Sequence, residues 1–411
     1  MQTFLVGGAV RDQLLGLEVV ERDWVVVGTT PEALEAAGYR AVGRDFPVFL
    51  HPDTHEEYAL ARTERKTAPG YRGFIVHAAP DVTLEQDLER RDLTINAIAQ
   101  TPDGEIIDPF NGSADLKNKV LRHVSPAFSE DPVRILRVAR FAARFARYGF
   151  RIAPDTLDMM QQMVHDGEAD ALVPERVWKE METAFGYDSP QTFIQTLRDT
   201  DALKVILPEV DALFGVPQPA KYHAEGDSAV HTLMVIEEAA KLAQQKRKSS
   251  ANEIVFAALC HDLGKALTPQ EDWPSHHDHE NLGVPAVTAV CDRLRVPNSF
   301  RNLAIKSCRY HLHCHRAKEL KATSMVKTLS SLDALRKPEQ FDDFLLVCEA
   351  DARGRLPSVT DYPQAALMKH AAQAIAEVDA AAISATADDK SKISELIYNA
   401  RVQAVKQAFK R

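Results

Sequence analysis

Two acidic residues, Glu21 and Asp23, stand two positions apart just before the apolar run WVVV at residues 24–27. Alternate residues of a strand point to the same side, so we expect both carboxylates on one face where the strand begins. Neighbouring like charges repel unless a cation relieves them, and oxygen ligands of this kind suit Mg²⁺, which could also hold a triphosphate. Taken alone, the pair could also be two solvated acids.

A glycine pair lies upstream of these acids. Gly7 and Gly8 follow the apolar run FLV, and a short helix is expected from Ala9 to Leu15, ended by Gly16. Glycines let the backbone approach a phosphate, and the following helix N-terminus favours an anion. Arg11, in the first turn, adds a charged fork. Such turns are common. A phosphate-binding role is favoured here because twelve residues separate Gly8 from the acidic pair that begins at Glu21.

A basic helix is predicted after Asp131, with Asp131 as its N-cap and Pro132 in its first turn. Its arginines recur every three or four residues and form one stripe, while the apolar residues between them face a core. The stripe comprises Arg134, Arg137, Arg140 and Arg144, and the core side comprises Ile135, Leu136, Val138 and Phe141. Residues 116–151 hold nine Lys and Arg against two acids. By charge alone, a solvated helix face would explain the stripe.

Asp131 and Arg134 together offer one acceptor beside one donor. That pair matches the edges of cytosine and adenine, which each present a donor beside an acceptor. Uracil and guanine have the reverse polarity and would leave a buried charge unpaired, at a cost of about 2–5 kcal/mol. The two side chains could therefore select C and A. The alternative is that they pair with each other on a solvated face.

Histidines and aspartates dominate the second half of the chain. His261 and Asp262 end a helical pattern in CHDLGK, His231 begins an earlier helix, and His279, His311 and Asp351 follow. Imidazole and carboxylate groups on converging helices suit a divalent transition metal with a bound water as nucleophile.

The run HLHCH at residues 311–315 also admits a zinc site, but the cysteines supply no second good pair of ligands. We therefore expect His311 to be a ligand and His313 and His315 to be surface residues. We also expect His276 and His277 to be surface residues, because the neighbouring His279 fits the motif better.

The elements that carry these residues change character along the chain. Residues 1 to about 125 mix β-rich runs with short helices, and helical periodicity dominates from Glu130 onward. A Pro/Gly-rich stretch at residues 208–227 is interpreted as a linker. The sequence thus predicts an α+β fold. Its expected domains are a head (1–125), a helical neck and body (126–225), a histidine-rich helical domain (226–360) and a helical tail (361–411).

The composition is that of a globular protein: 411 residues, 45% hydrophobic and 26% charged. Apolar runs are too short to span a membrane, and no basic leader or cleavage site is seen at the start. The five cysteines form no C-x-x-C pair, which fits a reducing compartment. We therefore expect a cytoplasmic protein without a membrane partner. A net charge of −10 argues against a coat of nucleic acid but leaves room for a local RNA site.

Several sequence blocks in residues 4–180 resemble a known family. After Gly-Gly and acid-x-acid come Arg62-Thr63-Glu64, RRDLTINA at 90–97, Ile107-Asp108-Pro109 and EDPVRILR at 130–137. They resemble the class II tRNA nucleotidyltransferases and bacterial poly(A) polymerases, whose head has the fold shared with DNA polymerase β.

The resemblance implies a polymerase-β-type nucleotidyltransferase head that adds and repairs the CCA end of tRNA. The substrates would be CTP and ATP, with Mg²⁺ and without a nucleic-acid template. It implies that Glu21 and Asp23 are catalytic metal ligands and that Glu57 is a third acid. The nucleotide site would comprise Gly8, Arg11, Arg91, Asp131, Arg134, Arg137 and Arg140, with Arg91 on the triphosphate. One departure is Glu21, because the family normally has Asp there.

The histidine–aspartate pattern resembles the HD phosphohydrolase superfamily. The resemblance implies His231, His261, Asp262 and Asp351 as metal ligands, with His261 and Asp262 catalytic and Ni²⁺ or another divalent transition metal bound. It implies 2′,3′-cyclic phosphodiesterase, 2′-nucleotidase and phosphatase activity on RNA ends or nucleotides. The alternative is an HD fold kept for tRNA docking or for forming a homodimer.

Two rival functions remain for the whole chain. Bacterial poly(A) polymerases share the head blocks but usually carry a basic C-terminal extension and lack the HD domain, so CCA addition is favoured. The second rival is a catalytically idle tRNA-binding module. Glu21 favours it, whereas Asp23, Asp131, Arg134 and the HDLGK block oppose it.

Overall fold

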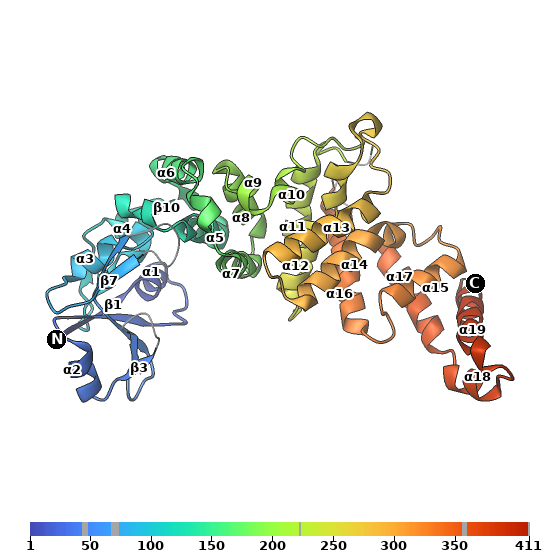
Figure 1. Ribbon diagram of the computed structural model, residues 1–411, viewed down its shortest axis with the longest axis horizontal. Coiled ribbons are helices and arrows are strands. Elements are labelled where there is room, and N and C mark those ends of the chain that lie inside the picture. Colours follow the sequence, from blue (N-terminus) through green and yellow to red (C-terminus); the bar gives the residue numbers. More distant parts are fainter. Residues whose placement is uncertain (43–47, 67–73, 222, 356–359, 410–411) are drawn as a thin grey trace. The chain divides into compact units, whose positions relative to one another are not determined.

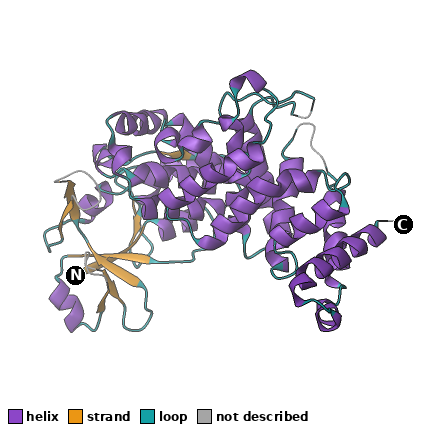
Figure 2. Cartoon of the chain, turned by 45° about the vertical axis from the view of Figure 1, so that its right-hand side comes forward, coloured by secondary structure: helices purple, strands orange, loops and turns teal. Residues whose placement is uncertain are grey.

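The computed structural model describes residues 1–42, 48–66, 74–221, 223–355 and 360–409; for 64–66, 74 and 75 it describes the backbone only. The chain divides into two compact units. The first comprises residues 1–184 and 192–206, and the second comprises 185–191 and 207–411. The expected α+β organisation is confirmed, because the strands are concentrated in the N-terminal part and the second unit is built of helices (Figure 2).

A seven-stranded mixed sheet forms the head, in the order β3-β4-β5-β2-β1-β8-β9. Its strands are β1 (Gln2–Val6), β2 (Asp23–Val27), β3 (Arg40–Val42), β4 (Val48–Leu50), β5 (Glu57–Leu60), β8 (Ala99–Gln100) and β9 (Ile106–Ile107). Strand β2 is central, antiparallel to β1 and parallel to β5. Its alternating residues enter two hydrophobic clusters, Val25 in one and Val26 in the other, so the sheet is covered on both faces.

Short pairs of strands and a series of helices complete the first unit (Figure 1). The pairs are β6 (Thr63–Lys66) with β7 (Phe74–His77), and β10 (Val120–Leu121) with β11 (Arg151–Ile152). The α-helices are α1 (Gly8–Leu14), α2 (Pro31–Ala36), α3 (Leu84–Glu89), α4 (Gly112–Asn118), α5 (Val133–Phe145), α6 (Pro154–His165), α7 (Pro174–Phe185), α8 (Pro190–Asp199) and α9 (Leu203–Ile206). The 3₁₀ turns are η1 (Thr94–Asn96), η2 (Pro126–Glu130), η3 (Ala146–Tyr148) and η4 (Glu168–Ala171).

Helix α5 carries the predicted arginine stripe. Its apolar side is buried as expected, with Ile135, Leu136 and Val138 fully inaccessible to solvent. The helix starts slightly later than predicted, because Pro132 and not Asp131 occupies the N-cap. Asp131 still caps the first turn, since its Oδ1 accepts a hydrogen bond from the Val133 N–H at 3.1 Å.

The second unit is entirely helical within its described residues. Its helices are α10 (Pro208–Asp211), α11 (Ser228–Gln245), α12 (Ala251–Cys260), α13 (His279–Arg293), α14 (Asn298–His315), α15 (Ala322–Ser331), α16 (Pro338–Arg353), α17 (Pro363–Ala376), α18 (Ala380–Thr386) and α19 (Ile393–Ala408). Three 3₁₀ turns lie between them, η5 (Leu263–Leu267), η6 (Gln270–Asp272) and η7 (Lys390–Lys392). Helices α11, α12, α14 and α16 pack around a shared core (Figure 1).

Gly264, in the HDLGK block, allows a close approach between two segments of this unit. A Cβ atom there would lie 1.9 Å from the carbonyl oxygen of His279, at the start of α13. Any side chain would push α13 away. The glycine therefore keeps His279 close to Asp262, which lies two residues before it.

The interpretation of residues 208–227 as a linker is wrong. Val210, Leu213 and Val216 are buried, and the side chain of Asp227 caps α11. The Pro and Gly residues shape tight turns, with Gly215 and Gly226 at positive φ, and do not mark a free segment. The chain passes into the second unit at residue 207, whereas the sequence placed a boundary at 225/226.

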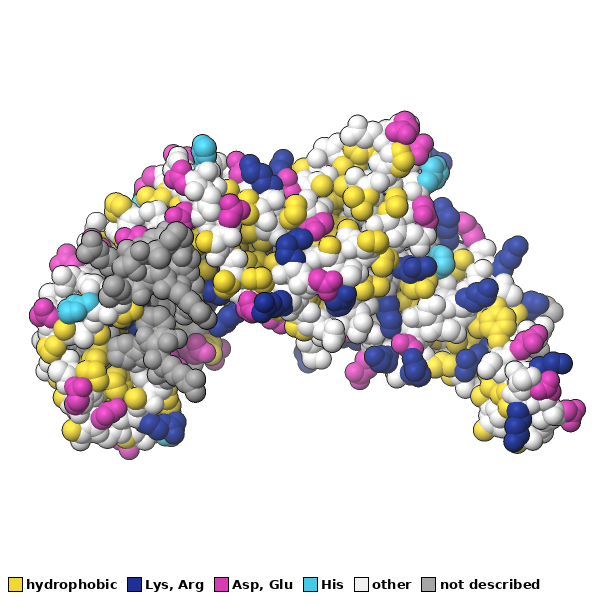
Figure 3. All heavy atoms as spheres, viewed as in Figure 1, with side chains coloured by type: hydrophobic (Ala, Val, Ile, Leu, Met, Phe, Trp, Pro, Cys, Tyr) yellow, Lys and Arg dark blue, Asp and Glu magenta, His cyan; other side chains and the backbone are white. Residues whose placement is uncertain are grey.

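The cysteines, the apolar helices and the surface charges can each be compared with the expectations from composition. All five cysteines are buried thiols. The described residues contain no helix long and apolar enough to cross a membrane. On the face drawn in Figure 3, Lys and Arg side chains of the second unit are interspersed with acidic ones.

Candidate active sites

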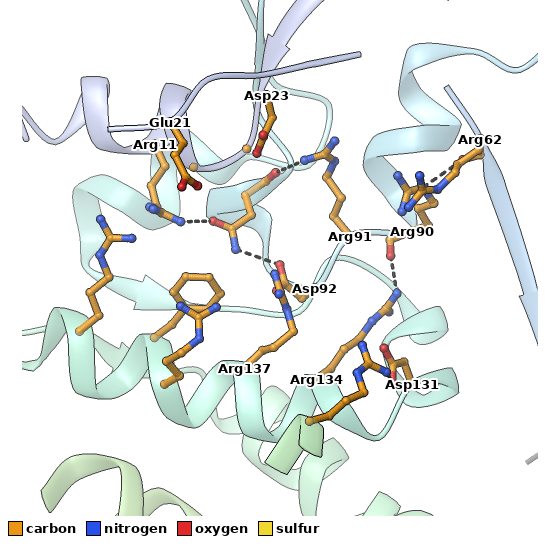
Figure 4. Close-up of a pocket in the computed structure, with 17 residues that line it drawn as sticks. Arg11, Glu21, Asp23, Arg62, Arg90, Arg91, Asp92, Asp131, Arg134 and Arg137 are labelled. Carbon is orange, nitrogen blue, oxygen red and sulfur yellow. Dashed lines mark hydrogen bonds and ion pairs between the residues drawn. The ribbon is translucent and has the colours of Figure 1, made fainter. Parts of the chain in front are cut away.

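A cavity of about 610 Å³ lies in the first unit, between the turn before α1, the start of β2 and helix α5 (Figure 4). Nine residues predicted for the head site line it, and the third acid, Glu57, is not among its lining residues. The nine are Gly8, Arg11, Glu21, Asp23, Arg91, Asp131, Arg134, Arg137 and Arg140. Nine arginines and four carboxylates make up its charged lining, so the cavity favours a polyanion.

The two predicted metal carboxylates point into this cavity (Figure 4). Asp23 is the first residue of β2, and Glu21 lies just before the strand. Burial raises the pKa of Asp23, Arg91 opposes that shift, and the charge of Glu21 raises it further. A bound cation would relieve both the burial cost and the repulsion, so these residues fit a divalent metal ion. Glu57 is in register with Asp23 on the neighbouring parallel strand.

Arg11 is buried and forms part of the cavity wall. It donates from Nε to Asp12 Oδ1 at 2.9 Å and from Nη1 to Asn96 Oδ1, and the Phe141 ring lies against its guanidinium. Burial is the main cause of its lowered pKa. Arg11 therefore lies beside the glycine turn as a charged fork held by Asp12 and Asn96.

Asp92 links Arg137 to the same network. Arg137 Nε donates to Asp92 Oδ2 at 2.6 Å, and Asn96 Nδ2 donates to Asp92 Oδ1 at 2.9 Å. Burial by itself would raise the pKa of Asp92, but the charge of Arg137 and these hydrogen bonds hold it far below its usual value. The carboxylate stays ionised and fixes the guanidinium that faces the cavity.

Asp131 and Arg134 both line the cavity, and each contacts a further part of the first unit. Arg134 donates to the carbonyl oxygens of Ala127, at 2.8 Å, and of Arg90. Asp131 Oδ1 instead lies 3.8 Å from Nη1 of Arg176, on α7. The alternative placed this pair on a solvated face, and the burial of Arg134 does not fit that alternative.

Several lining residues received no role from the sequence. Arg62 and Arg90 stood in the quoted blocks, Arg144 stood in the stripe, and Arg176 lay outside every motif. A signal for Arg176 existed, because Arg176 and Glu180 are four apart on α7 and share a face, and Glu180 pairs with Arg140. The side chain of Glu64, in the quoted block Arg62-Thr63-Glu64, lies outside the described residues.

The second unit holds a cavity of about 750 Å³ where five segments converge. The predicted ligands come from α11 (His231), the end of α12 (His261 and Asp262) and α16 (Asp351), with His279 and His311 from α13 and α14. His231 Nε2 lies 3.2 Å from Asp351 Oδ1, and His261 Nε2 lies 3.1 Å from Asp262 Oδ2. The six side chains form two neighbouring groups, one of His231, His261 and Asp351 and one of Asp262, His279 and His311.

The two oxygens of Asp262 face different histidines. Oδ2 faces His261 and His231, whereas Oδ1 lies 3.2 Å from His279 Nε2 and 3.6 Å from His311 Nε2. In the described part of the chain, the buried atoms His261 Nε2 and Asp262 Oδ1 have no hydrogen-bond partner. Orphaned nitrogen and oxygen donors that converge in this way fit a divalent transition metal.

His315 was expected at the surface, and that expectation is wrong. Its Nε2 lies 2.6 Å from Asp351 Oδ2, and its Nδ1 lies 2.9 Å from the hydroxyl of Tyr362. Arg355 also donates to Asp351, from Nη2 at 2.9 Å. The signal was the four-residue spacing of His311 and His315, which places both on one face of α14.

The remaining histidines divide between support and surface. His276 and His313 are half-buried and not surface residues: His276 contacts Thr268 and the carbonyl oxygen of Pro217, and His313 contacts Thr328. His277 is exposed as expected. His223, from the segment interpreted as a linker, lines the cavity, and burial and the nearby His231 lower its pKa to about 4.

Three family models match the chain in order along its length. They describe a poly A polymerase head domain (residues 3–122), a probable RNA and SrmB-binding site of polymerase A (149–214) and an HD domain (229–355). Together with the two cavities, they define a nucleotidyltransferase head joined to an HD domain.

Curated relatives narrow this class to one family. The chain is 59% identical over 408 residues to the multifunctional CCA protein of Thioalkalivibrio sulfidiphilus, covering 99% of this chain and 98% of that one. It is 62% identical over 381 residues to that of Methylococcus capsulatus, covering 92% and 88%. The chain belongs to the family of multifunctional CCA proteins, and it is a CCA-adding nucleotidyltransferase.

Solved structures share the fold. A CCA-adding enzyme in its apo form II aligns with a TM-score of 0.67 at 20% identity, covering 99% of this chain and 90% of that one. The Thermotoga maritima CCA-adding enzyme complexed with tRNA aligns with a TM-score of 0.64 at 20% identity, with the same coverage. The family and fold expected from the sequence blocks are thereby confirmed.

Proposed function

We propose that the first unit adds and repairs the 3′-terminal CCA of tRNA, using CTP, ATP and Mg²⁺ and releasing pyrophosphate. The observation that carries the proposal is the placement of Glu21 and Asp23 in a cavity whose lining includes nine arginines. Solved CCA-adding enzymes of this fold include complexes with CTP, with ATP and with tRNA, which supports the same partners here.

In this proposal, Glu21 and Asp23 hold Mg²⁺, which when bound offsets the charge that develops at the α-phosphate and activates the tRNA 3′-hydroxyl. The hydroxyl oxygen bonds to the α-phosphorus, and the bond to the pyrophosphate oxygen breaks. Arg91 and the turn at Gly8 hold the triphosphate. Arg11 acts through Asn96 and Asp12 to fix the walls of the cavity.

We infer that Asp131 and Arg134 read the base, with Arg137 and Arg140 completing the nucleotide site. Asp92 holds the Arg137 guanidinium, and Glu180 pairs with Arg140, so both side chains are oriented before a nucleotide enters. Preorientation lowers the entropy cost of binding and sharpens discrimination between bases.

The proposal is tested with tRNA that lacks its last three nucleotides, incubated with CTP, ATP and Mg²⁺. The expected result is a product three nucleotides longer and one pyrophosphate released per addition. Long homopolymer tails of A would instead support poly(A) synthesis. An unchanged tRNA, with retained tRNA binding, would support the idle binding module.

For the second unit we propose metal-dependent hydrolysis of phosphate esters, including 2′,3′-cyclic and 2′-phosphates at RNA ends or in nucleotides. Orphaned His261 Nε2 and Asp262 Oδ1 carry this proposal, and Lys265, Arg316 and Arg355 supply positive charge at the same cavity. His231, His261, Asp262 and Asp351 would hold Ni²⁺, Co²⁺ or Mn²⁺, which when bound supplies an activated water.

The test is release of a monophosphate from a 2′,3′-cyclic nucleotide after each of these metals is added to chelated protein. Hydrolysis with at least one metal is expected. If none supports it, the HD fold is better explained as a tRNA-docking or homodimer element. We also retain as proposals a cytoplasmic location and the division into residues 1–125, 126–225, 226–360 and 361–411.

A further inference from the structure

The four histidines around Asp262 share one orientation. In each ring, Nε2 points towards Asp262 or Asp351, and Nδ1 lies within hydrogen-bond distance of an acceptor oxygen. For three of them that acceptor is a nearby main-chain carbonyl: Ala258 for His261 at 2.6 Å, His276 for His279 at 2.7 Å, and Cys308 for His311 at 2.9 Å. These contacts place the hydrogen on Nδ1 and leave the Nε2 lone pair for a metal.

His231 differs from the other three. Its Nδ1 lies 3.1 Å from Oε1 of Glu225 and 3.2 Å from the carbonyl oxygen of Gly354. The Glu225 side chain is only 1% exposed. A carboxylate oxygen accepts from a ring N–H, so Glu225 favours a hydrogen on Nδ1, and Nε2, which lies 3.2 Å from Asp351 Oδ1, is the ring nitrogen that faces the proposed metal site.

Two contacts hold this arrangement in place. His223 Nδ1 lies 2.8 Å from the same Oε1 of Glu225, so two imidazoles share the carboxylate oxygen. Gly354 lies so close to α11 that a Cβ atom there would stand 2.7 Å from Cγ2 of Val235. The end of α16 therefore keeps its carbonyl oxygen beside His231.

We propose that Glu225 is a positioning residue that fixes the ring and tautomer of His231 and sets the metal affinity of this centre. The inference rests on the metal site proposed for the second unit. A carboxylate behind a metal-binding imidazole raises the basicity of the ligand, and its loss typically weakens metal binding about 10- to 100-fold. No sequence pattern indicated this role, since Glu225 lies in the stretch interpreted as a linker.

The experiment compares Co²⁺ binding by full-length variants in an Asp23→Ala background, which removes the metal site proposed for the head. Isothermal titration and the visible absorption of bound Co²⁺ both report on the second unit. Glu225→Gln keeps the side-chain shape and is expected to bind Co²⁺ about 10- to 100-fold more weakly. Asp343→Asn is the matched control, because Asp343 is a buried carboxylate that pairs with Lys248 and Ser250. It is expected to bind as the parent does.

Equal Co²⁺ affinity in Glu225→Gln and the control would overturn the proposal. If Glu225→Gln does not fold, ¹⁵N NMR of the histidines in the parent protein decides instead. His231 is expected as the Nδ1–H tautomer, and an Nε2–H tautomer would overturn the role of Glu225. If the parent binds no Co²⁺, Ni²⁺ or Mn²⁺, the proposed metal site fails, and the tautomer of His231 still tests its link to Glu225.

Discussion

The two cavities of this chain solve the same problem, the binding of phosphate groups and a metal ion, in different ways. In the first unit, three arginines of the α5 stripe are matched by carboxylates of the protein: Arg137 by Asp92, Arg144 by Asp12 and Arg140 by Glu180. Among the described residues that line this cavity, Arg91 Nε is a buried atom without a hydrogen-bond partner, and this cationic N–H suits an anionic ligand and not a metal ion. In the second, buried donor atoms of His261 and Asp262 are left without a hydrogen-bond partner in the described structure.

This difference shows what each cavity requires from its ligand. A cavity whose charges are paired already has its shape before a nucleotide arrives, and the ligand brings its own charge and metal. A cavity with orphaned buried nitrogen and oxygen atoms pays a desolvation cost that a resident metal would offset. We therefore expect loss of metal to leave the first cavity formed and to loosen the second.

The largest expected effect comes from Asp23→Ala. Loss of this carboxylate removes one of the two proposed metal ligands of the head, and nucleotide addition should fall by about 1,000-fold or more. Hydrolysis of cyclic phosphates should be unchanged, because its residues lie in the other unit. Loss of both activities in a variant that keeps its circular dichroism spectrum would contradict the assignment of two separate centres.

His261→Ala is the reciprocal change. We expect it to abolish phosphodiesterase activity on 2′,3′-cyclic nucleotides, because one lost ligand costs most of the metal affinity, and to leave CCA addition nearly unchanged. Chelation followed by addition of Ni²⁺, Co²⁺ or Mn²⁺ should restore the parent and not the variant. Restored hydrolysis in the variant would mean that His261 is not needed for metal binding.

Asp92→Asn tests the preformed network of the first cavity. The variant leaves Arg137 without its carboxylate, so we expect a loss of about 1.5–3 kcal/mol in the free energy of unfolding and a higher KM for nucleotides. The pKa of Asp92 is lowered in the folded protein, so this stabilisation is present above the unfolded pKa of about 4 and is lost as pH falls towards the folded pKa.

Denaturant unfolding of both proteins should therefore give the same difference at every pH between 5 and 8. A difference that fades between pH 8 and 5 would show that Asp92 titrates there and is not held ionised by Arg137. Asp103→Asn, which changes an exposed acid of the same unit, is the control and should leave stability and KM unchanged.

The smallest effect is expected from Glu21→Asp. Asp is the usual residue of the resembling family at this position, so the variant should keep or raise the rate of nucleotide addition. The check is the single-turnover rate at saturating Mg²⁺. A large loss would show that the backbone before β2 is adapted to the longer Glu side chain.

The motif-bearing parts of the molecule could be predicted from the sequence because local rules governed them. The glycine pair located α1, the apolar run WVVV located β2, and helical periodicity located the stripe on α5. The HDLGK block and its distant partners were also found, since each stands on a recognisable helical pattern.

Tertiary contacts account for what was missed. Arg176 contacts Asp131 from a helix more than forty residues further along the chain, and His315 of α14 contacts Asp351 of α16. Glu225 was hidden because its Pro- and Gly-rich surroundings indicate a loop whether that loop is free or packed. In each case the partner was set by packing, which no local pattern records.

The most direct test of the account is incorporation of each nucleoside triphosphate, offered separately, into tRNA that lacks its 3′ end. If Asp131 and Arg134 read the base edge, CTP is incorporated by this tRNA and ATP by tRNA that already ends in CC, while UTP and GTP are refused on both. Asp131→Ala should reduce the difference in incorporation rate between CTP or ATP and UTP or GTP. Efficient incorporation of UTP by the unaltered protein would contradict the central claim that these side chains select C and A.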